Sequence, residues 1–232
     1  MPQHEFGKRV RPETQFGEIV KGHVIYEQAD HTIVPGTTTI TNQLNKPALP
    51  GWSARVTREG YDYRAITEES RRVGDLAHKM VHCHFLGKEV DTSEYSPSQI
   101  ALAENAMIKF FAYLDDHRMQ PRLVEVPLVS EKYDYGGTID CYGDLDGALA
   151  LADWKTGSGI YTGNKLQAAG YWNLLIENGY PCEEVRVVRI GREETDEYEE
   201  LRIRNPEQLF ALFVLLLRFY YGMRDYAGPG AP

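Results

Sequence analysis

The segment GTIDCYGDLDGALALADWK, residues 137–155, decides the fold expected of this chain of 232 residues. Asp146 and Gly147 lie between two runs of strand-forming residues, and an Asp-Gly pair in this position favours a two-residue type I′ hairpin turn. With this turn Leu145 pairs with Ala148, and each step along one strand is matched by a step along the other. The segment therefore predicts an antiparallel hairpin of defined register.

That register brings acidic side chains together. Counting outward from the turn places Asp140 opposite Asp153, with Cβ atoms about 5 Å apart, while Lys155 points from the same face. Two opposed carboxylates destabilise a hairpin unless a cation compensates, and divalent cations such as Mg²⁺ take carboxylate oxygens. The alternative is a surface salt-bridge cluster. Leu149 and Leu151 share the face and favour a covered site, where an acidic pair needs a partner.

Periodicity along the rest of the chain predicts an α/β (α+β) fold with a mixed sheet between helices. The expected strands are 123–129, 137–142, 145–155, 184–190 and 199–203. The expected helices are 67–87, one that opens with Ser96 as N-cap and Pro97 at its first position, 165–178 and 206–226.

The N-terminal part of the chain has a different pattern. Residues 19–28 and 32–40 look extended, and residues 45–52 predict a proline-punctuated turn before a further helix. We therefore expect one domain over 1–232, in which 1–66 form N-terminal strands and a helical elaboration and 67–226 form the core.

Composition excludes several classes of protein. With 42% hydrophobic and 25% charged residues the chain is expected to fold, not to be disordered. The three cysteines, Cys83, Cys141 and Cys182, form no CxxC pair, which argues against a disulfide framework or a zinc ribbon. The longest apolar run, 209–217, is about half of the roughly 18 to 20 residues that span a bilayer. We expect a reduced, cytoplasmic protein that does not contact a membrane.

The charge is distributed unevenly. The net charge is −9, yet residues 1–90 hold 12 Lys/Arg against 11 Asp/Glu, and residues 91–232 hold 13 against 23. A nucleic-acid surface would therefore draw mainly on the first ninety residues. That part interleaves aromatic and basic side chains that either stack on unpaired bases or pack in a core. They are Trp52, Tyr61, Tyr63, Arg55, Arg58 and Arg64.

Four short motifs now carry a resemblance to a known family. Gly137 to Asp140 reads G-x-x-D, Asp153 to Gly157 reads D-x-K-T-G, Gln167 to Tyr171 reads Q-x-x-x-Y, and Gly74 to His78 reads G-x-x-x-H. Taken in their order along the chain, which begins with the Gly74–His78 motif, they resemble the RecB-type branch of the PD-(D/E)XK nuclease superfamily. This branch includes phage exonucleases and the nucleases of CRISPR adaptation. The resemblance covers roughly residues 35–180. It implies a restriction-endonuclease-like core, a central mixed sheet flanked by helices, with an N-terminal helical elaboration.

The resemblance also implies roles for individual residues. The implied metal ligands are His78, Asp140, Asp153 and the backbone carbonyl of Trp154. The implied catalytic residues are Asp140, Asp153, Lys155 and Glu125, the last with the least defined role. Gln167 and Tyr171, one helical turn apart, would contact the substrate strand.

Two departures from the family pattern matter. Many relatives carry an acid four residues after the motif histidine, where this chain has His82. The pair His78 and His82 does not make a zinc-protease motif, because that motif needs Glu directly after the first histidine and this chain has Lys79. Iron–sulfur members use four cysteines around the core, so with three cysteines we expect no cluster.

The expected function is a deoxyribonuclease that depends on one or two Mg²⁺ or Mn²⁺ ions. An exonuclease of phage or bacterial DNA processing and recombination is favoured. Alternatives are a structure-selective endonuclease of the same fold and a catalytically silent DNA-binding subunit. The expected partners are DNA and either a recombination protein or further copies of the chain, since the C-terminal apolar stripe is typical of core packing or of an oligomer contact.

Overall fold

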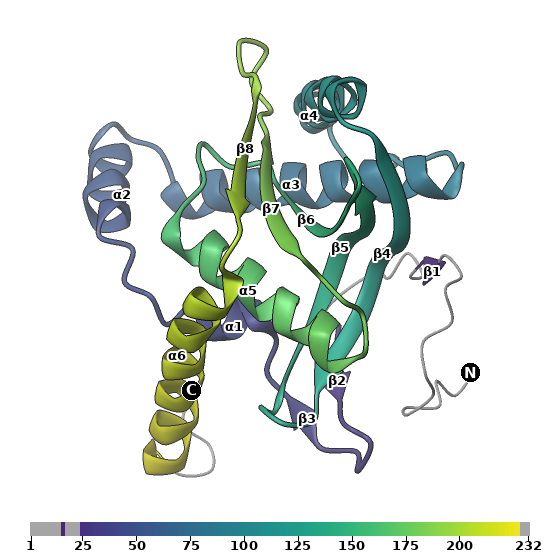
Figure 1. The fold of residues 1–232 in the computed structure, drawn as a ribbon. Coiled ribbons are helices and arrows are strands. Elements are labelled where there is room, and N and C mark those ends of the chain that lie inside the picture. The colour runs from purple at the N-terminus through teal and green to yellow at the C-terminus, as the bar shows by residue number, and fades with distance from the viewer. Residues whose placement is uncertain (1–14, 17–23, 228–232) are drawn as a thin grey trace.

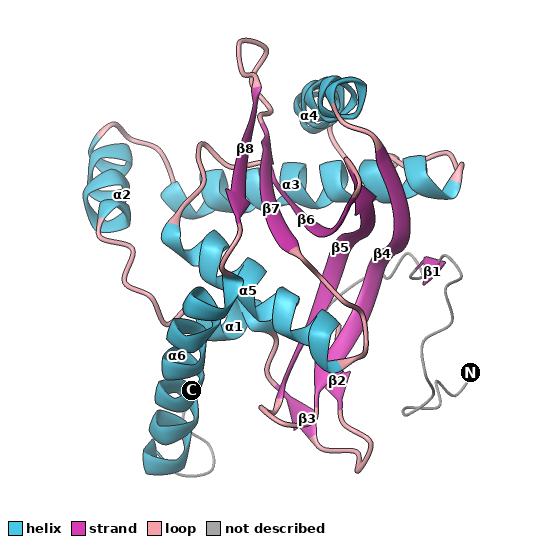
Figure 2. Cartoon of the chain, in the orientation of Figure 1, coloured by secondary structure: helices cyan, strands magenta, loops and turns pink. Residues whose placement is uncertain are grey.

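The computed structural model describes residues 15–16 and 24–227, and its centre is a mixed six-stranded sheet in the order β1-β4-β5-β6-β7-β8 (Figures 1 and 2). The strands are β1 (Gln15–Phe16), β4 (Met119–Ser130), β5 (Tyr135–Leu145), β6 (Ala148–Lys155), β7 (Glu184–Ile190) and β8 (Tyr198–Ile203). Strands β6 and β7 are parallel and are linked through a helix, whereas β4, β5 and β6 form an antiparallel meander. The expected α+β fold is confirmed.

Helices cover both faces of this sheet. They are α1 (Thr37–Thr41), α2 (Ala48–Arg58), α3 (Tyr63–Leu86), α4 (Pro97–Asp116), α5 (Thr162–Glu177) and α6 (Pro206–Ala227). Figure 1 shows α5 in front of the sheet and α3 behind it. None of the helices in the described part of the chain combines the length and the apolar character that a membrane crossing requires.

Two buried clusters lie on opposite faces of the sheet. Leu151 packs with the α5 and α6 residues Leu174 and Phe213, whereas Ala152 packs with Leu76 of α3 and Phe110 of α4. Because side chains of a strand alternate between faces, the leucines of β6 enter one core and its alanines enter the other. The sheet is therefore buried on both sides, except where its strands part.

The predicted hairpin is confirmed from its turn to the pair Cys141–Ala152, but the predicted pair Asp140–Asp153 is not formed. Asp146 and Gly147 have φ values of 58° and 89°, and a type I′ turn needs both to be positive. Leu145 pairs with Ala148, and the ladder continues to Cys141 opposite Ala152.

Beyond Cys141 and Ala152 the two strands separate. Strand β5 continues along β4 as far as Tyr135, and β6 continues along β7 as far as Lys155. Asp140 and Asp153, which the register count placed opposite each other, are thus the first residues past the shared ladder. We call this opening, between Asp140 and Asp153, the fork.

The helices differ from expectation at their beginnings. Helix α3 starts at Tyr63, four residues before the expected start at Thr67, because Asp62 caps it by accepting a hydrogen bond from the Arg64 backbone N–H at 2.8 Å. The expected boundary at residue 66 therefore falls inside α3. At α4 the predicted Ser96 cap is confirmed, with Gln99 completing a capping box.

The N-terminal part is less extended than its sequence pattern indicates. The two-stranded sheet of β2 (Tyr26–Glu27) and β3 (Ile33–Val34) is short, and Thr37 already begins α1. The expected strand over 32–40 is wrong beyond Val34, because Thr37 donates to the Gly136 carbonyl at 2.8 Å and Ile40 is buried in the core. Residues 19–23 of the other expected strand lie outside the described residues.

The expected turn over 45–52 is also partly wrong, since α2 begins at Ala48. Pro50 lies in the first turn of α2, where a missing backbone N–H costs no helical hydrogen bond.

Candidate metal centre at the fork

Three side chains from three elements meet beside the fork. His78 of α3, Glu125 of β4 and Asp140 of β5 each offer a ligand atom, and these atoms all lie within 4.8 Å of one another. His78 Nδ1 is 3.7 Å from Asp140 Oδ2 and 3.9 Å from Glu125 Oε1. The separations are too long for direct hydrogen bonds. The three side chains therefore lie close together, but His78 does not hydrogen-bond to either carboxylate.

Glu125 reaches this space through a strained backbone. Its neighbours Val124 and Val126 pair with Cys141 and Ile139, so Glu125 stands across from Asp140. Its φ of 53° is in the left-handed region, which costs a residue with a Cβ atom roughly 1–3 kcal/mol. Strain of this kind is concentrated at functional sites. The sequence alone gave Glu125 the least defined role, whereas the structure groups it with His78 and Asp140.

Asp153 lies on the other side of the fork and is fully buried. Lys155 Nζ is 2.8 Å from its carboxylate. Asp153 Oδ1 accepts a hydrogen bond from Lys155, and Asp153 Oδ2 is also 2.8 Å from that ammonium group. The structure thus places Asp153 as the partner of Lys155, and not in the group of three, so its role as a metal ligand stays a prediction.

The backbone of β6 ties Asp140 to the fork. The Trp154 N–H donates to Asp140 Oδ2 at 2.9 Å. The Trp154 ring is buried edge-on against Phe110 and Tyr113, with centroids 5.2 and 5.6 Å away. This packing holds β6, and hence the Trp154 carbonyl, in place, although the carbonyl's role as a ligand stays a prediction.

The pKa shifts of the two aspartates at the fork arise mainly from the burial of their charged groups. Burial raises the pKa of Asp153 to about 6, against the opposing effect of Lys155. Burial also raises the pKa of Asp140, and the Glu125 carboxylate adds to the rise. Burial lowers the pKa of His78, but Asp140 and Glu125 outweigh it and raise that pKa to about 9. A divalent cation would relieve this repulsion, so the residues present fit one.

Gln167 and Tyr171 lie together beside the same strands, as their spacing predicts. Gln167 Nε2 donates to the Tyr171 hydroxyl at 3.0 Å and to Thr38 Oγ1 at 2.8 Å. The Tyr171 ring packs on Gly137, where an added Cβ would come within 2.5 Å of it. Tyr171 is buried. Its contact with substrate stays a prediction, and the structure shows it as a support for β5.

The other motif glycine has a similar steric reason. A Cβ added at Gly74 would lie 3.0 Å from Thr156 Oγ1. The glycine therefore lets α3 approach the end of β6, one helical turn before His78. His82, one turn further on, is buried and is not in the group of three, which was sought among the described residues.

Sequence reasoning missed Tyr26. Its hydroxyl hydrogen-bonds with Thr138 Oγ1 at 3.1 Å, and its ring occupies the space that a side chain at Gly136 would need. Burial raises the pKa of Tyr26, and the nearby charges of Glu125 and Asp140 raise it further. No local signal indicates this contact, because 112 residues separate Tyr26 from Thr138.

Comparisons with known proteins add little. No family model matches the chain, and no curated protein matches it. Sixteen chains of solved structures match, among them the crystal structure of SSO0001, which is 16% identical over 67% of this chain and 75% of that one, with a TM-score of 0.35. A similarity of this size carries no argument about function, so function is argued from the site itself.

Proposed function

We propose that this protein is a deoxyribonuclease that hydrolyses DNA phosphodiester bonds with Mg²⁺ or Mn²⁺, most simply as an exonuclease. The observation that carries the proposal is the fork, where His78, Glu125 and Asp140 bring ligand atoms within 4.8 Å of one another beside the buried Asp153–Lys155 ion pair. His78 Nδ1 lies 3.9 Å from Glu125 and 3.7 Å from Asp140, too far for direct hydrogen bonds, so these ligand atoms are free to face a cation between them.

His78, Glu125 and Asp140 are the residues that would hold a metal ion, with Asp153 beside them. A bound divalent cation supplies Lewis-acid polarisation of a phosphate and makes a water molecule more acidic. The protein's own contribution is to fix the ligand atoms from three rigid elements, so that little reorganisation accompanies the reaction. The strained Glu125 and the hydrogen-bonded Asp140 meet this requirement.

Lys155 has a distinct part in the mechanism. Burial lowers the pKa of its ammonium group, but Asp153 and Asp140 outweigh that effect and raise it. Lys155 therefore keeps its proton at neutral pH and acts as a cation, not as a general base. Its charge suits the negative charge that develops on a phosphate in the transition state. The buried Asp153 carboxylate accepts a hydrogen bond from the ammonium group and so fixes its orientation.

The wider setting follows from the same proposal. DNA is the substrate, and phage or bacterial recombination in the cytoplasm is the process in which such a nuclease would act. Helix α6 exposes an apolar stripe through which a recombination partner or a further copy of the chain would bind; its residues include Leu212, Leu215 and Phe219.

A cleavage assay tests the proposal. End-labelled linear DNA and circular DNA, each single- and double-stranded, are incubated with Mg²⁺, Mn²⁺ or EDTA. Loss of linear DNA that needs the metal is expected in the wild type and not in Lys155→Ala, while Lys88→Ala, which removes an exposed lysine, serves as the matched control. Cleavage of circular single strands would instead indicate the endonuclease. Metal binding without any cleavage would favour the DNA-binding subunit.

A further inference from the structure

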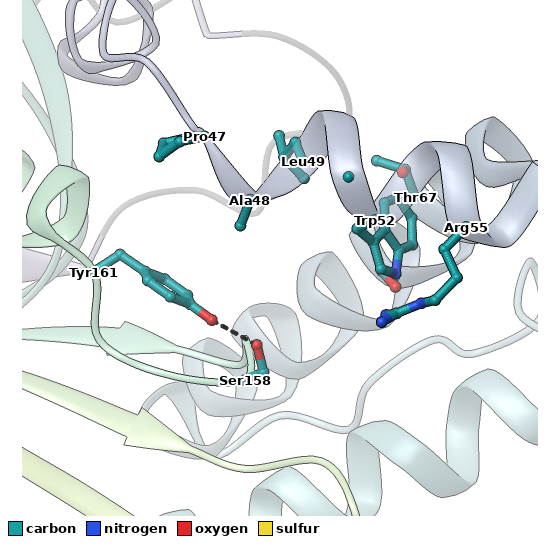
Figure 3. Close-up of a pocket in the computed structure, with 10 residues that line it drawn as sticks. Pro47, Ala48, Leu49, Trp52, Arg55, Thr67, Ser158 and Tyr161 are labelled. Atoms are coloured by element: carbon teal, nitrogen blue, oxygen red, sulfur yellow. Dashed lines mark hydrogen bonds between the residues drawn. The ribbon is translucent and has the colours of Figure 1, made fainter.

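A second concave site lies beside the fork, at the edge of the N-terminal helices. An open cavity of about 620 Å³ is lined by residues of α2, the first turns of α3 and the loop that follows β6 (Figure 3). Figure 1 shows α2 standing away from the sheet, so this cavity opens beside a helix that takes little part in the core. Nothing in the metal centre requires it.

The apolar walls of the cavity are left in water. Of the eleven residues of α2, all described, only Val56 is buried. Trp52 and Leu49 of α2 line the cavity, and Leu49 is 49% exposed. On the facing side Tyr161 is 59% exposed, and its hydroxyl is held by Ser158 Oγ at 2.7 Å. Figure 3 shows these side chains on either side of the opening. Two aromatic rings kept outside the core indicate a flat apolar ligand.

The polar lining indicates that this ligand is anionic. Arg55 of α2 lines the cavity together with Thr67, whose hydroxyl donates to the Tyr63 carbonyl, and Ser70, whose hydroxyl accepts from Arg192. Arg192 donates to the Ser70 carbonyl at 3.0 Å and brings a second guanidinium to this side of α3. Helix α2 holds two arginines and no acid in a chain of net charge −9. Arg55 is the one charged residue among the ten that line the cavity, so the lining itself is positively charged.

Helix α3 connects the cavity to the metal centre. Thr67, Ser70, Gly74 and His78 follow one another at helical spacing and so share one face. At 1.5 Å per residue, Ser70 and His78 are about 12 Å apart along the helix axis. This distance corresponds to roughly three or four stacked nucleotides at 3.4 Å each. On the facing side Ser158 follows Lys155 by three residues, so both walls lead from the cavity to the fork.

We infer that the cavity binds an unpaired nucleotide of the substrate strand, with its base between Trp52 and Tyr161 and a phosphate at Arg55. The inference rests on the proposed function and names the substrate as DNA with a single-stranded end. A base inside a duplex has both faces covered by its neighbours, whereas an unpaired base offers a face on which aromatic rings stack. The nucleotide bound here would lie three to four positions from the scissile phosphate.

Binding in EDTA tests this inference without any cleavage. Fluorescence anisotropy compares a labelled 20-nucleotide single strand with a blunt duplex of the same sequence. Trp52→Ala and Arg55→Ala are each expected to weaken single-strand binding about tenfold and to leave duplex binding within about twofold. Tyr226→Ala and Arg218→Ala, which remove exposed side chains of α6 that do not line the cavity, are matched controls that should bind as the wild type does. Trp52→Phe should restore most of the affinity, and thermal unfolding confirms that each variant is folded.

An abasic scan then locates the bound base. A single abasic site moved along the strand should weaken binding to the wild type most at one position, and this penalty should disappear in Trp52→Ala. The inference is overturned if Trp52→Ala binds single strands normally, if duplex affinity falls equally, or if the wild type binds no single strand. The cleavage assay reports separately on the proposed function: a wild type that cleaves DNA while Trp52→Ala binds normally refutes the cavity alone.

Discussion

The two ends of the β5–β6 hairpin hold similar charged groups, but the aspartate and the histidine are hydrogen-bonded to each other at one end and not at the other. At the turn, Asp146 shares hydrogen bonds with Arg186 at 2.7 Å and His117 at 2.8 Å. At the fork, His78 approaches Asp140 no closer than 3.7 Å. The same hairpin therefore carries one acidic residue that is fully partnered and another that is not.

The turn end is a saturated network around a buried arginine. Arg186 is 1% exposed, and its guanidinium reaches Asp146, Glu184, Glu200 and the Leu145 carbonyl. The pKa of Asp146 falls to about 2: burial opposes the fall, but the hydrogen bonds from Arg186 and His117 outweigh it. Such a network contributes to stability and leaves no acceptor for a ligand.

The fork end shows the reverse shift, since burial raises the pKa of Asp153 to about 6. The difference teaches that the number of charges does not distinguish a structural cluster from a functional one. What distinguishes them is whether the hydrogen-bonding capacity of the carboxylates is used within the protein.

The largest effect is expected from removing the arginine at the turn. Arg186→Met should lower the free energy of unfolding by about 3–5 kcal/mol, because Asp146, Glu184 and Glu200 each lose a charge-assisted hydrogen bond worth about 1.5–3 kcal/mol. Urea unfolding measures this, and the folded variant should still cleave DNA. The control is Arg202→Met, whose side chain is 40% exposed and whose loss should cost under about 1 kcal/mol. Equal losses of unfolding free energy in the two variants would contradict the view that the buried Arg186 network stabilises the turn.

A smaller effect, on rate, is expected at the fork. Lys155→Met should reduce the cleavage rate about 10²–10³-fold, because a fixed positive charge near the reacting phosphate is lost. Initial rates on end-labelled DNA with Mg²⁺ measure the change. Asp146→Asn, at the turn, should keep a rate within about twofold of the wild type. If the two variants lost rate equally, the fork would have no special role.

Neutralising one acid at each end should shift stability in opposite directions. Asp140→Asn keeps an acceptor for the Trp154 N–H and removes repulsion, so in EDTA it should raise the free energy of unfolding by up to about 1 kcal/mol. Asp146→Asn should lower it by about 1–2 kcal/mol, since its charge-assisted hydrogen bonds weaken. Thermal unfolding with and without Mg²⁺ checks both, and Mg²⁺ should stabilise the wild type but not Asp140→Asn. A loss of stability in both variants would contradict the comparison.

The smallest effect is a pH dependence confined to the turn. The pKa of Asp146 is lowered from its ordinary value near 4 to about 2, so its stabilising contribution is present above pH 4 and is lost as the pH falls toward 2. The difference in unfolding free energy between the wild type and Asp146→Asn should shrink over this range. A difference that stayed constant from pH 5 to pH 2 would show that the Asp146 charge contributes nothing.

Local sequence patterns predicted the part of the site that is local in the chain. The Asp-Gly turn sets the register of the hairpin as far as Cys141 and Ala152, and helical spacing puts Gln167 beside Tyr171. The left-handed backbone of Glu125 follows from β4 being held in register on both sides of it, which only the assembled sheet imposes.

The placement of distant residues could not be predicted in the same way. Tyr26 reaches β5 across 112 residues, and Arg186 reaches the hairpin turn from β7 across 40. Such contacts depend on how the layers pack, which no short motif encodes. The early start of α3 was missed because Asp62 caps the helix, while acids at 68 and 69 resemble a first turn and lie in its interior.

The fork also has a consequence for folding kinetics. Its charged groups come from α3, β4, β5 and β6, so they span residues 78 to 155 and require contacts between distant parts of the chain. Pairings of this kind are usually completed late, because their loop-closure entropy must be overcome first. A metal ion would then find its ligands only after the folding barrier has been crossed. Added Mg²⁺ should therefore slow unfolding while leaving the refolding rate nearly unchanged.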